Sequence, residues 1–295
     1  MGFGRVVGHR RPVQLLRAMI ERGRVPHALL FVGPEGIGKR TVALAFLQAL
    51  NCAVSPGEGC DRCPSCIKLS RLSHPDLLFV SSEGATVKVD QIREVMRGLT
   101  MRPLEARWRG VIVDGAEQMT LEAANAFLKT LEEPPPRTVL ILLARKAEEL
   151  PPTVVSRCQL LRFFPLRDEE VREVLRMQGV GDPAAAAFAE GSPGRALRMD
   201  IDALKTLRKE VEDFLAAGDV LSALELAEHF SRDRDGAKHL LGVLLSFLKE
   251  ELWVKADEGL LDLLWEIQRV RRSLDDNANV RLSLERSLLE VLRHR

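Results

Sequence analysis

The sequence lacks the features that would assign it to a specialised class of protein. Its net charge is only +1, so the total charge gives no reason to expect a nucleic-acid partner, and any DNA contact must come from a local cluster. The N-terminal residues contain no apolar stretch long enough for a signal peptide. The strongest apolar run, residues 139–144, is far too short to cross a bilayer. We therefore expect a cytoplasmic protein without a membrane partner.

Cysteine is scarce, and its few copies are concentrated in one place. The chain has five cysteines, of which four lie between residues 52 and 66. In a cytosolic chain such a cluster more often holds a metal than a disulfide, and four thiolates suit tetrahedral Zn²⁺. Iron–sulfur ligation and unliganded thiols are the alternatives, but the Cys-Pro of ferredoxin-type patterns is absent. We favour a structural zinc module at residues 52–66, with the ligands Cys52, Cys60, Cys63 and Cys66.

What is present is the composition of a packed globular protein of two or three domains, with 46% hydrophobic residues in a chain of 295. Apolar runs separated by amphipathic helical patterns predict a parallel α/β sheet over residues 1–164. The expected strands are residues 28–32, 77–80, 110–113 and 138–143. Residues 165–200 are expected to form a small helical lid, in which Ser192-Pro193 begins a helix.

The last part of the chain, residues 201–295, carries no strand signal and is expected to be an all-helical domain. Its apolar residues recur at helical spacing in three groups. These are Leu240, Leu244, Phe247, Leu248 and Leu252, then Leu260, Leu263, Leu264 and Ile267, then Leu282, Leu284, Leu288, Leu289 and Leu292.

The segment GPEGIGKR, residues 33–40, follows a predicted strand and opens a predicted helix, which is the context of a phosphate-binding P-loop. Glycines expose backbone N–H groups, the helix N-terminus favours anions, and the lysine reaches phosphate oxygens. A second apolar strand, residues 110–113, is followed by Asp114. In P-loop ATPases a carboxylate at the end of such a strand helps to hold Mg²⁺. The candidate nucleotide-binding residues are therefore Gly33, Gly36, Gly38, Lys39 and Asp114.

Three catalytic parts of this pocket are missing. Arg40 stands where a Ser or Thr hydroxyl would bind Mg²⁺. Gly115 stands where ATPases with this pair of motifs carry a glutamate that activates water. Arg145 follows the predicted strand at residues 138–143, after which such ATPases carry a Thr or Asn that orients the water. The pattern argues against hydrolysis and also weakens the case for ATP and Mg²⁺ binding in this chain.

Four stretches resemble the AAA+ clamp-loader family of bacterial DNA polymerase III. They are VPHALLFVG at residues 25–33, the four-cysteine insert, AANAFLKTLEEPP at residues 123–135, and Ser-Arg-Cys at residues 156–158. Their order and spacing match over most of residues 1–200. The resemblance implies an AAA+ domain with a zinc insert, a lid and a helical collar that holds the subunit in an assembly. The eroded positions Arg40, Gly115 and Arg145 favour the non-hydrolysing delta-prime branch over the catalytic gamma/tau branch.

The resemblance also assigns roles to residues. In related clamp loaders the arginine of Ser-Arg-Cys, here Arg157, projects toward ATP bound by a neighbouring subunit, and such arginine fingers contribute on the order of 10³–10⁵ in rate. Arg195 matches the lid arginine that contacts nucleotide in its own subunit, with a local salt bridge as the alternative. We interpret residues 125–133 as a packing helix that ends in Glu132-Glu133-Pro134, without a catalytic role.

The implied partners are the gamma/tau and delta subunits, together with the sliding clamp and primer–template DNA. Polymerase activity would lie in another chain of the holoenzyme. One alternative is an active ATPase of the gamma/tau type that uses Glu117 as its base, and another is a zinc-dependent nucleic-acid-binding module. The basic residues Arg93, Arg97, Arg102, Arg107 and Arg109 would form either a stripe that contacts DNA phosphates or a solvated face.

Overall fold

The computed structural model describes residues 2–82, 86–180, 185–186, 189–198, 201–255, 257–274 and 278–294. The described chain divides into two compact units. The first contains the residues up to 180 together with Ala189–Leu197, and the second contains residues 185–186 and the chain from Arg198 onward. The segment predicted as a lid is thus mostly grouped with the sheet, and its status as a separate domain stays a prediction.

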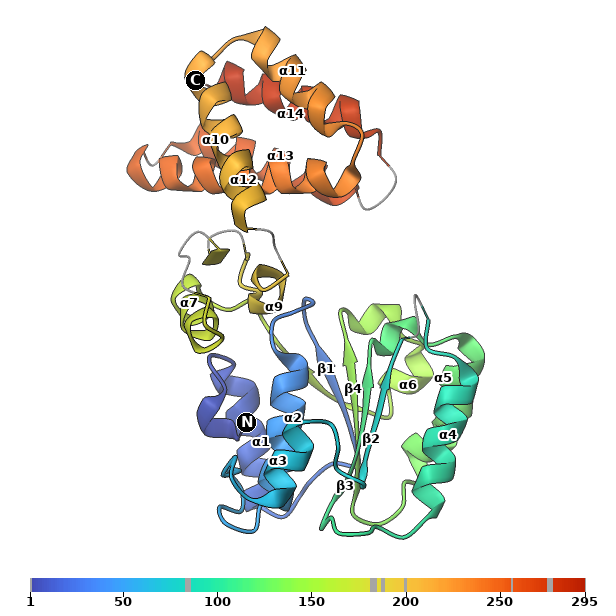
Figure 1. The fold of residues 1–295 in the computed structure, drawn as a ribbon. Coiled ribbons are helices and arrows are strands. Elements are labelled where there is room, and N and C mark those ends of the chain that lie inside the picture. The colour runs from blue at the N-terminus through green and yellow to red at the C-terminus, as the bar shows by residue number, and fades with distance from the viewer. Residues whose placement is uncertain are drawn as a thin grey trace. The chain divides into compact units, whose positions relative to one another are not determined.

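The first unit is built on a parallel sheet with the strand order β2-β3-β4-β1-β5 (Figure 1). All four predicted strands are present. The strands are β1 (Ala28–Val32), β2 (Leu77–Ser81), β3 (Arg109–Asp114), β4 (Thr138–Ala144) and β5 (Gln159–Arg162). The three central strands are buried almost throughout, which is why they read as continuous apolar runs in the sequence.

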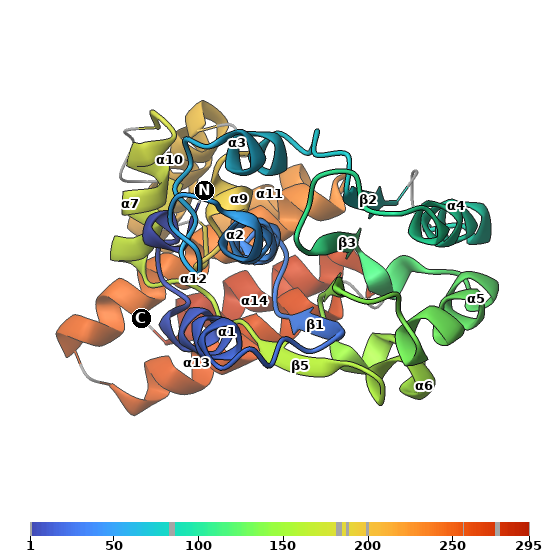
Figure 2. The same cartoon turned by 90° about the horizontal axis from the view of Figure 1, so that it is seen from below.

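Helices cover both faces of this sheet (Figures 1 and 2). Successive strand residues point to opposite faces, so Leu29 and Phe31 belong to one core cluster while Leu30 and Val32 belong to the other. The helices of the first face are α1 (Arg10–Glu21), α2 (Lys39–Asn51) and α3 (Pro64–Ser70). Those of the second face are α4 (Val89–Thr100), α5 (Leu121–Glu132) and α6 (Pro152–Val155). Short 3-10 turns lie at η1 (Phe3–Arg5), η2 (Ala116–Gln118) and η3 (Ala147–Glu149).

A buried aspartate fixes the loop between α4 and β3. Asp76 is 4% exposed, and its carboxylate accepts the backbone N–H groups of Leu104, Glu105 and Ala106, each at 2.8 Å. Burial alone would raise the pKa of Asp76, but these three donors together hold it below its usual value. The loop is therefore attached to the start of β2 by one charged side chain.

Arg109 does not belong to an exposed basic stripe. It is 4% exposed, and its guanidinium donates to the carbonyl oxygens of Leu99 at 2.9 Å and Met101 at 2.5 Å. These carbonyls lie at the C-terminal end of α4, where helical hydrogen bonds run out, so Arg109 caps that helix. Arg93 is exposed on the same helix and pairs with Asp90 at 3.1 Å. A DNA contact by Arg93 and Arg97 stays a prediction, and Arg109 takes no part in it.

Two short helices follow the sheet within the first unit, α7 (Asp168–Met177) and α9 (Pro193–Ala196). As predicted, Ser192 begins the second of these: its hydroxyl accepts the Arg195 N–H at 3.3 Å, and Pro193 occupies the first helical position. None of the helices in the described ranges is long and apolar enough to span a membrane.

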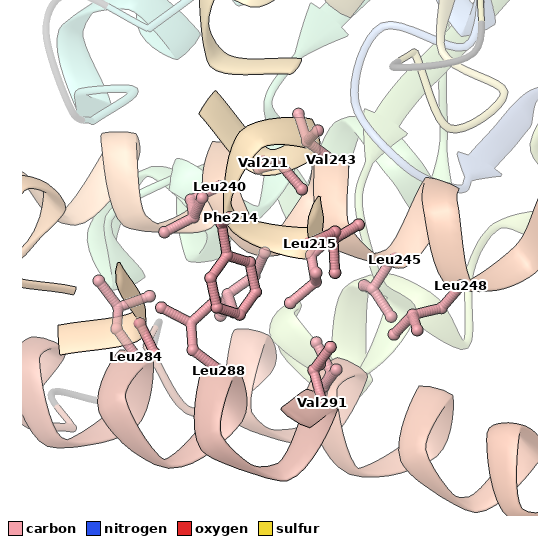
Figure 3. Close-up of a cluster of buried hydrophobic side chains, with 14 of the residues drawn as sticks. Val211, Phe214, Leu215, Leu240, Val243, Leu245, Leu248, Leu284, Leu288 and Val291 are labelled. Carbon is pink, nitrogen blue, oxygen red and sulfur yellow. The ribbon is translucent and has the colours of Figure 1, made fainter. Parts of the chain in front are cut away.

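The second unit is helical, as the spacing of its apolar residues predicts. Its helices are α10 (Ile201–Ala217), α11 (Val220–Phe230), α12 (Arg234–Lys255), α13 (Glu258–Ser273) and α14 (Val280–Arg293). Figure 3 shows the core that they share, with Phe214 of α10 beside Leu240 of α12 and Leu288 of α14. One predicted core residue is outside it, because Leu282 is 63% exposed in the first turn of α14.

Candidate nucleotide, metal and arginine sites

The P-loop adopts the backbone that its glycines predict. Gly36 and Gly38 have φ angles of +73° and +106°, in the region that side chains other than glycine rarely enter. Gly38 is the N-cap of α2, so the loop leads from the end of β1 directly into the helix N-terminus. The glycines at these positions are thus required by the turn.

The lysine of this loop contacts the loop itself. Lys39 is 9% exposed, and its ammonium donates to the carbonyl oxygens of Gly33 at 2.6 Å and Pro34 at 2.8 Å. Burial lowers the pKa of Lys39, while the carboxylates of Glu117 and Asp114 act in the opposite direction. The loop carbonyls thus hold the ammonium that a P-loop directs at phosphate oxygens.

Two of the carboxylates around Lys39, those of Asp114 and Glu117, have arginine partners from this chain. Arg40 Nη1 lies 3.5 Å from Asp114 Oδ2 at the end of β3, and its guanidinium lies 6.0 Å from the centre of the Phe79 ring. Burial raises the pKa of Asp114, with Arg40 as the largest opposing influence. The cation beside this carboxylate is therefore a guanidinium, at the position where a P-loop hydroxyl and Mg²⁺ would meet.

The second pair joins Glu117 and Arg145. Arg145 follows β4, and its Nε donates to Glu117 Oε1 at 3.0 Å. The Glu117 side chain is only 6% exposed, so this carboxylate is held against the guanidinium away from bulk water. Glu117 is consequently charge-paired, which argues against its use as a general base for water.

The segment that carries Arg195 lies directly on the P-loop. The Gly194 N–H donates to the Gly36 carbonyl at 2.9 Å, and the Ser192 hydroxyl donates to the Glu35 carbonyl at 2.8 Å. A side chain at Gly36 would come within 2.5 Å of the Ser192 hydroxyl, so the two backbones are in contact. The structure thus brings together the predicted residues Gly33, Gly36, Gly38, Lys39, Asp114 and Arg195. The Arg195 guanidinium pairs with Glu190 at 2.8 Å.

The four clustered cysteines converge on one point. Their sulfur atoms all lie within 4.8 Å of one another, and those of Cys52 and Cys63 are 3.9 Å apart. Four sulfurs bound to zinc at about 2.3 Å would lie about 3.8 Å apart, whereas a disulfide requires about 2.05 Å. Separations and ligand chemistry both fit a four-thiolate site for a metal such as zinc.

The surroundings of this cluster favour the thiolate of Cys60 and disfavour that of Cys66. The Ser55 N–H donates to Cys52 Sγ at 3.1 Å and the Cys63 N–H to Cys60 Sγ at 3.3 Å. Backbone N–H groups, that of Arg62 first, lower the pKa of Cys60 to about 6, while burial raises the pKa of Cys66 to about 12. A bound dication would favour the thiolate form of all four.

The module is joined to the rest of the first unit through both chain segments beside it. The Gly2 N–H donates to Asp61 Oδ1 at 2.7 Å, which attaches the N-terminal segment to the cysteine loop. On the other side, Asn51 and Trp108 exchange two hydrogen bonds of 2.9 Å, one step before Cys52. The start of the chain is therefore bonded to the cysteine loop, and the end of α2, which leads into Cys52, is bonded to the residue before β3.

Arg157 lies on a turn after α6 and contacts the end of α5. Its Nε donates to Glu132 Oε1 at 2.7 Å, and its Nη2 lies 2.5 Å from the same oxygen. Its Nη1 donates to the Thr153 carbonyl at 2.9 Å. Among the described residues, its hydrogen-bond partners come from α5 and the α6 turn, and none comes from the P-loop. Interpreting the end of α5 only as a helix terminator therefore missed Glu132.

Comparison with known proteins decides the family. The profile of the family described as "DNA polymerase III, delta subunit" matches residues 8–167, more than half of the chain. The chain belongs to this family. The profile of the cyanobacterial DNA polymerase III delta prime C-terminal domain matches residues 168–291, so the two profiles cover nearly the whole sequence.

Two relatives from Bacillus subtilis agree with this assignment. DNA polymerase III subunit delta' of Bacillus subtilis is 35% identical over 179 residues, which are 61% of this chain and 54% of that protein. Subunit tau of the same organism is 31% identical over 191 residues, or 64% of this chain and 33% of tau. The chain thus spans about half of the first relative and a third of the second. A gamma-subunit-related protein of Thermotoga maritima gives a TM-score of 0.46 at 23% identity, covering 96% of this chain and 99% of that one.

Proposed function

We propose that this chain is a non-hydrolysing subunit of the sliding-clamp loader of DNA polymerase III. In this proposal it closes one end of an AAA+ assembly with gamma/tau and delta subunits. It also presents Arg157 to ATP bound by a neighbouring subunit, while the assembly loads clamps onto primer–template DNA. The family, which includes delta and delta-prime subunits, supplies the setting. The proposal for this particular chain rests on its own residues.

The observation that carries the proposal is the pairing of both pocket carboxylates with arginines. Asp114 is paired with Arg40, and Glu117 is paired with Arg145. A hydrolytic site needs the first carboxylate for Mg²⁺ and a free carboxylate to activate water. Lys39 is held by loop carbonyls as well, so the lysine and both of these carboxylates have partners within the chain. This supports a subunit whose P-loop is a structural element.

The zinc module and the helical unit have supporting roles in the proposal. Cys52, Cys60, Cys63 and Cys66 hold a structural Zn²⁺ that stabilises an insert with little apolar core of its own. The helices α10–α14 form the collar, whose apolar residues supply contacts between subunits. Leucines exposed on these helices, such as Leu221 and Leu282, are available for such contacts.

The test is an Arg157→Ala variant in a complex reconstituted with gamma/tau and delta subunits. The variant is expected to fold and assemble, because Arg157 is a partly exposed side chain on a turn. DNA- and clamp-stimulated ATP hydrolysis is expected to fall in part, since other sites keep their own arginines, while clamp loading falls severely. Arg157→Lys should rescue poorly, because an ammonium cannot reproduce the fork of a guanidinium. Clamp loading at the unmutated rate would show that Arg157 is only a surface charge.

A further inference from the structure

The end of α5 holds the guanidinium of Arg157 in one orientation. Glu132 Oε1 accepts from Nε and lies 2.5 Å from Nη2, so it grips one edge of the planar group. On the Nη1 side, the Thr153 carbonyl accepts at 2.9 Å and the Ser156 hydroxyl at 3.3 Å. A guanidinium has five N–H donors, and the hydrogen bonds engage three of them, one on Nε and two on Nη1. Nη2 lies beside Glu132 in the ion pair and makes no hydrogen bond to the residues that the structure describes, so it can donate to an outside acceptor.

The position of Glu132 in its helix suggests a purpose beyond folding. It is the last residue of α5, where the partial negative charge of the helix end disfavours a carboxylate. Its side chain is 49% exposed, so it adds little to the core. Glu133, the next residue, is also exposed and has no side-chain partner among the described residues. Glu132 and Glu133 thus both lie at a helix end that disfavours negative charge, and Glu132 is the one that pairs with Arg157.

The turn that carries Arg157 gives the side chain little other support. The helix α6 spans only Pro152–Val155, and Arg157 follows it by two residues. A long side chain on such a turn samples many rotamers unless a neighbouring group selects one. Thr153 and Ser156 belong to the same short segment and therefore restrain the guanidinium only locally. Glu132 is the contact that ties it to a different, longer helix.

We propose that Glu132 is a positioning residue that preorganises Arg157 for the phosphates of a neighbouring subunit. The inference rests on the proposed finger role of Arg157. Glu132 touches no nucleotide in this scheme and acts only by fixing the guanidinium. Catalytic groups that are fixed before the reaction stabilise developing charge without further reorganisation, and a small misplacement is costly. Loss of Glu132 should therefore weaken the finger without removing it.

The experiment compares Glu132→Ala, Glu132→Gln and the control Glu133→Ala in the reconstituted, full-length complex. Glu132→Ala is expected to lower the rate of clamp loading about three- to tenfold, less than Arg157→Ala does. The kcat of stimulated ATP hydrolysis should fall with little change in KM, because the finger acts on the transition state. Glu132→Gln keeps the accepting oxygen and should retain an intermediate rate. Glu133→Ala removes the same charge one residue away and should leave the rate unchanged.

A double variant separates this inference from the finger role itself. If Glu132 acts through Arg157, then Glu132→Ala combined with Arg157→Ala should be no slower than Arg157→Ala alone. The thermal midpoint of the free chain should not fall in either Glu132 variant, because a helix-end carboxylate is removed. If Arg157→Ala slows loading but Glu132→Ala does not, or accelerates it, the positioning role is wrong and the finger role stands. If Arg157→Ala has no effect, both are wrong.

Discussion

Arg40 and Asp114 form an ion pair of 3.5 Å between the first turn of α2 and the end of β3. In a hydrolytic P-loop the corresponding two positions cooperate through a metal ion. Here they interact directly, and the guanidinium also lies against the Phe79 ring. The change from hydroxyl to guanidinium thus alters the electrostatics of the pocket as well as removing a ligand.

This pair leads us to predict that the purified chain hydrolyses no ATP. Steady-state turnover should equal that of a Lys39→Ala control, because Asp114 and Glu117 are each paired with an arginine where a hydrolytic site needs a metal ion and a water molecule. Turnover above that control would contradict the prediction.

Restoring the missing glutamate by Gly115→Glu should not rescue activity. Arg40 would still occupy the side of Asp114 that a metal needs. Gly115 also has a φ of +78°, so any side chain there strains the backbone, and its Cβ would meet Gln118 at 3.0 Å. The variant is expected to be less stable by about 1 kcal/mol, measured by urea denaturation, and still inactive.

The cysteine cluster is predicted to bind one equivalent of zinc per chain. Elemental analysis of freshly reduced protein should find zinc, and Cys66→Ser should abolish its retention. Cys158→Ser is the control, since Cys158 packs against the core on the other face of the sheet and should leave the metal content unchanged. Strong chelators should unfold the insert while sparing the main sheet. Iron in place of zinc, or metal-free protein, would overturn the assignment.

Asp76 is predicted to make the first unit sensitive to acid. Its folded-state pKa lies below the usual value, so its contribution is present at neutral pH and is lost as pH falls through that lowered pKa. Asp76→Asn should cost about 1.5–3 kcal/mol at pH 7, because an amide cannot accept all three N–H groups. The difference from the unmutated chain should shrink below about pH 4. The exposed Asp90→Asn is the control; an equal loss there would contradict the prediction.

Arg109 is predicted to matter for stability, in contrast to its exposed neighbour Arg107. Arg109→Met leaves the carbonyls of Leu99 and Met101 without their donor and should cost about 2–4 kcal/mol. Arg107→Met should change the free energy of unfolding by no more than about 0.5 kcal/mol. Equal effects in urea denaturation would show that Arg109 does not cap α4.

The sequence predicted four of the strands, including the outer strand β2, and missed the other outer strand, β5. Strands such as β4 are apolar at nearly every position, because both faces are covered by helices. The missed strand, β5, has only Leu161 buried among its four residues, so neither an apolar run nor clean alternation marks it. Strand order was also beyond prediction, since it depends on which long-range pairs form.

In the candidate sites, residues within short motifs were predicted and their distant partners were not. Local motifs located the P-loop, the cysteine cluster and Arg157, because each has a characteristic short spacing. Partners distant in sequence were missed: Glu132 lies 25 residues before Arg157, and Asp76 lies 28 residues before Leu104. Arg109 was misread because an arginine beside other arginines has the same pattern whether it is solvated or buried against carbonyls.

Because Trp108 is hydrogen-bonded to Asn51, its fluorescence can report on the sheet unit next to the cysteine cluster. The sequence has three tryptophans and no tyrosine, and Trp253 and Trp265 both lie in the second unit, on α12 and α13. Replacing those two by phenylalanine would leave Trp108 as the single strong emitter. Its backbone is hydrogen-bonded to the residue that precedes Cys52. The fluorescence of Trp108 should therefore follow metal release and unfolding of the sheet unit in real time, separately from events in the helical unit.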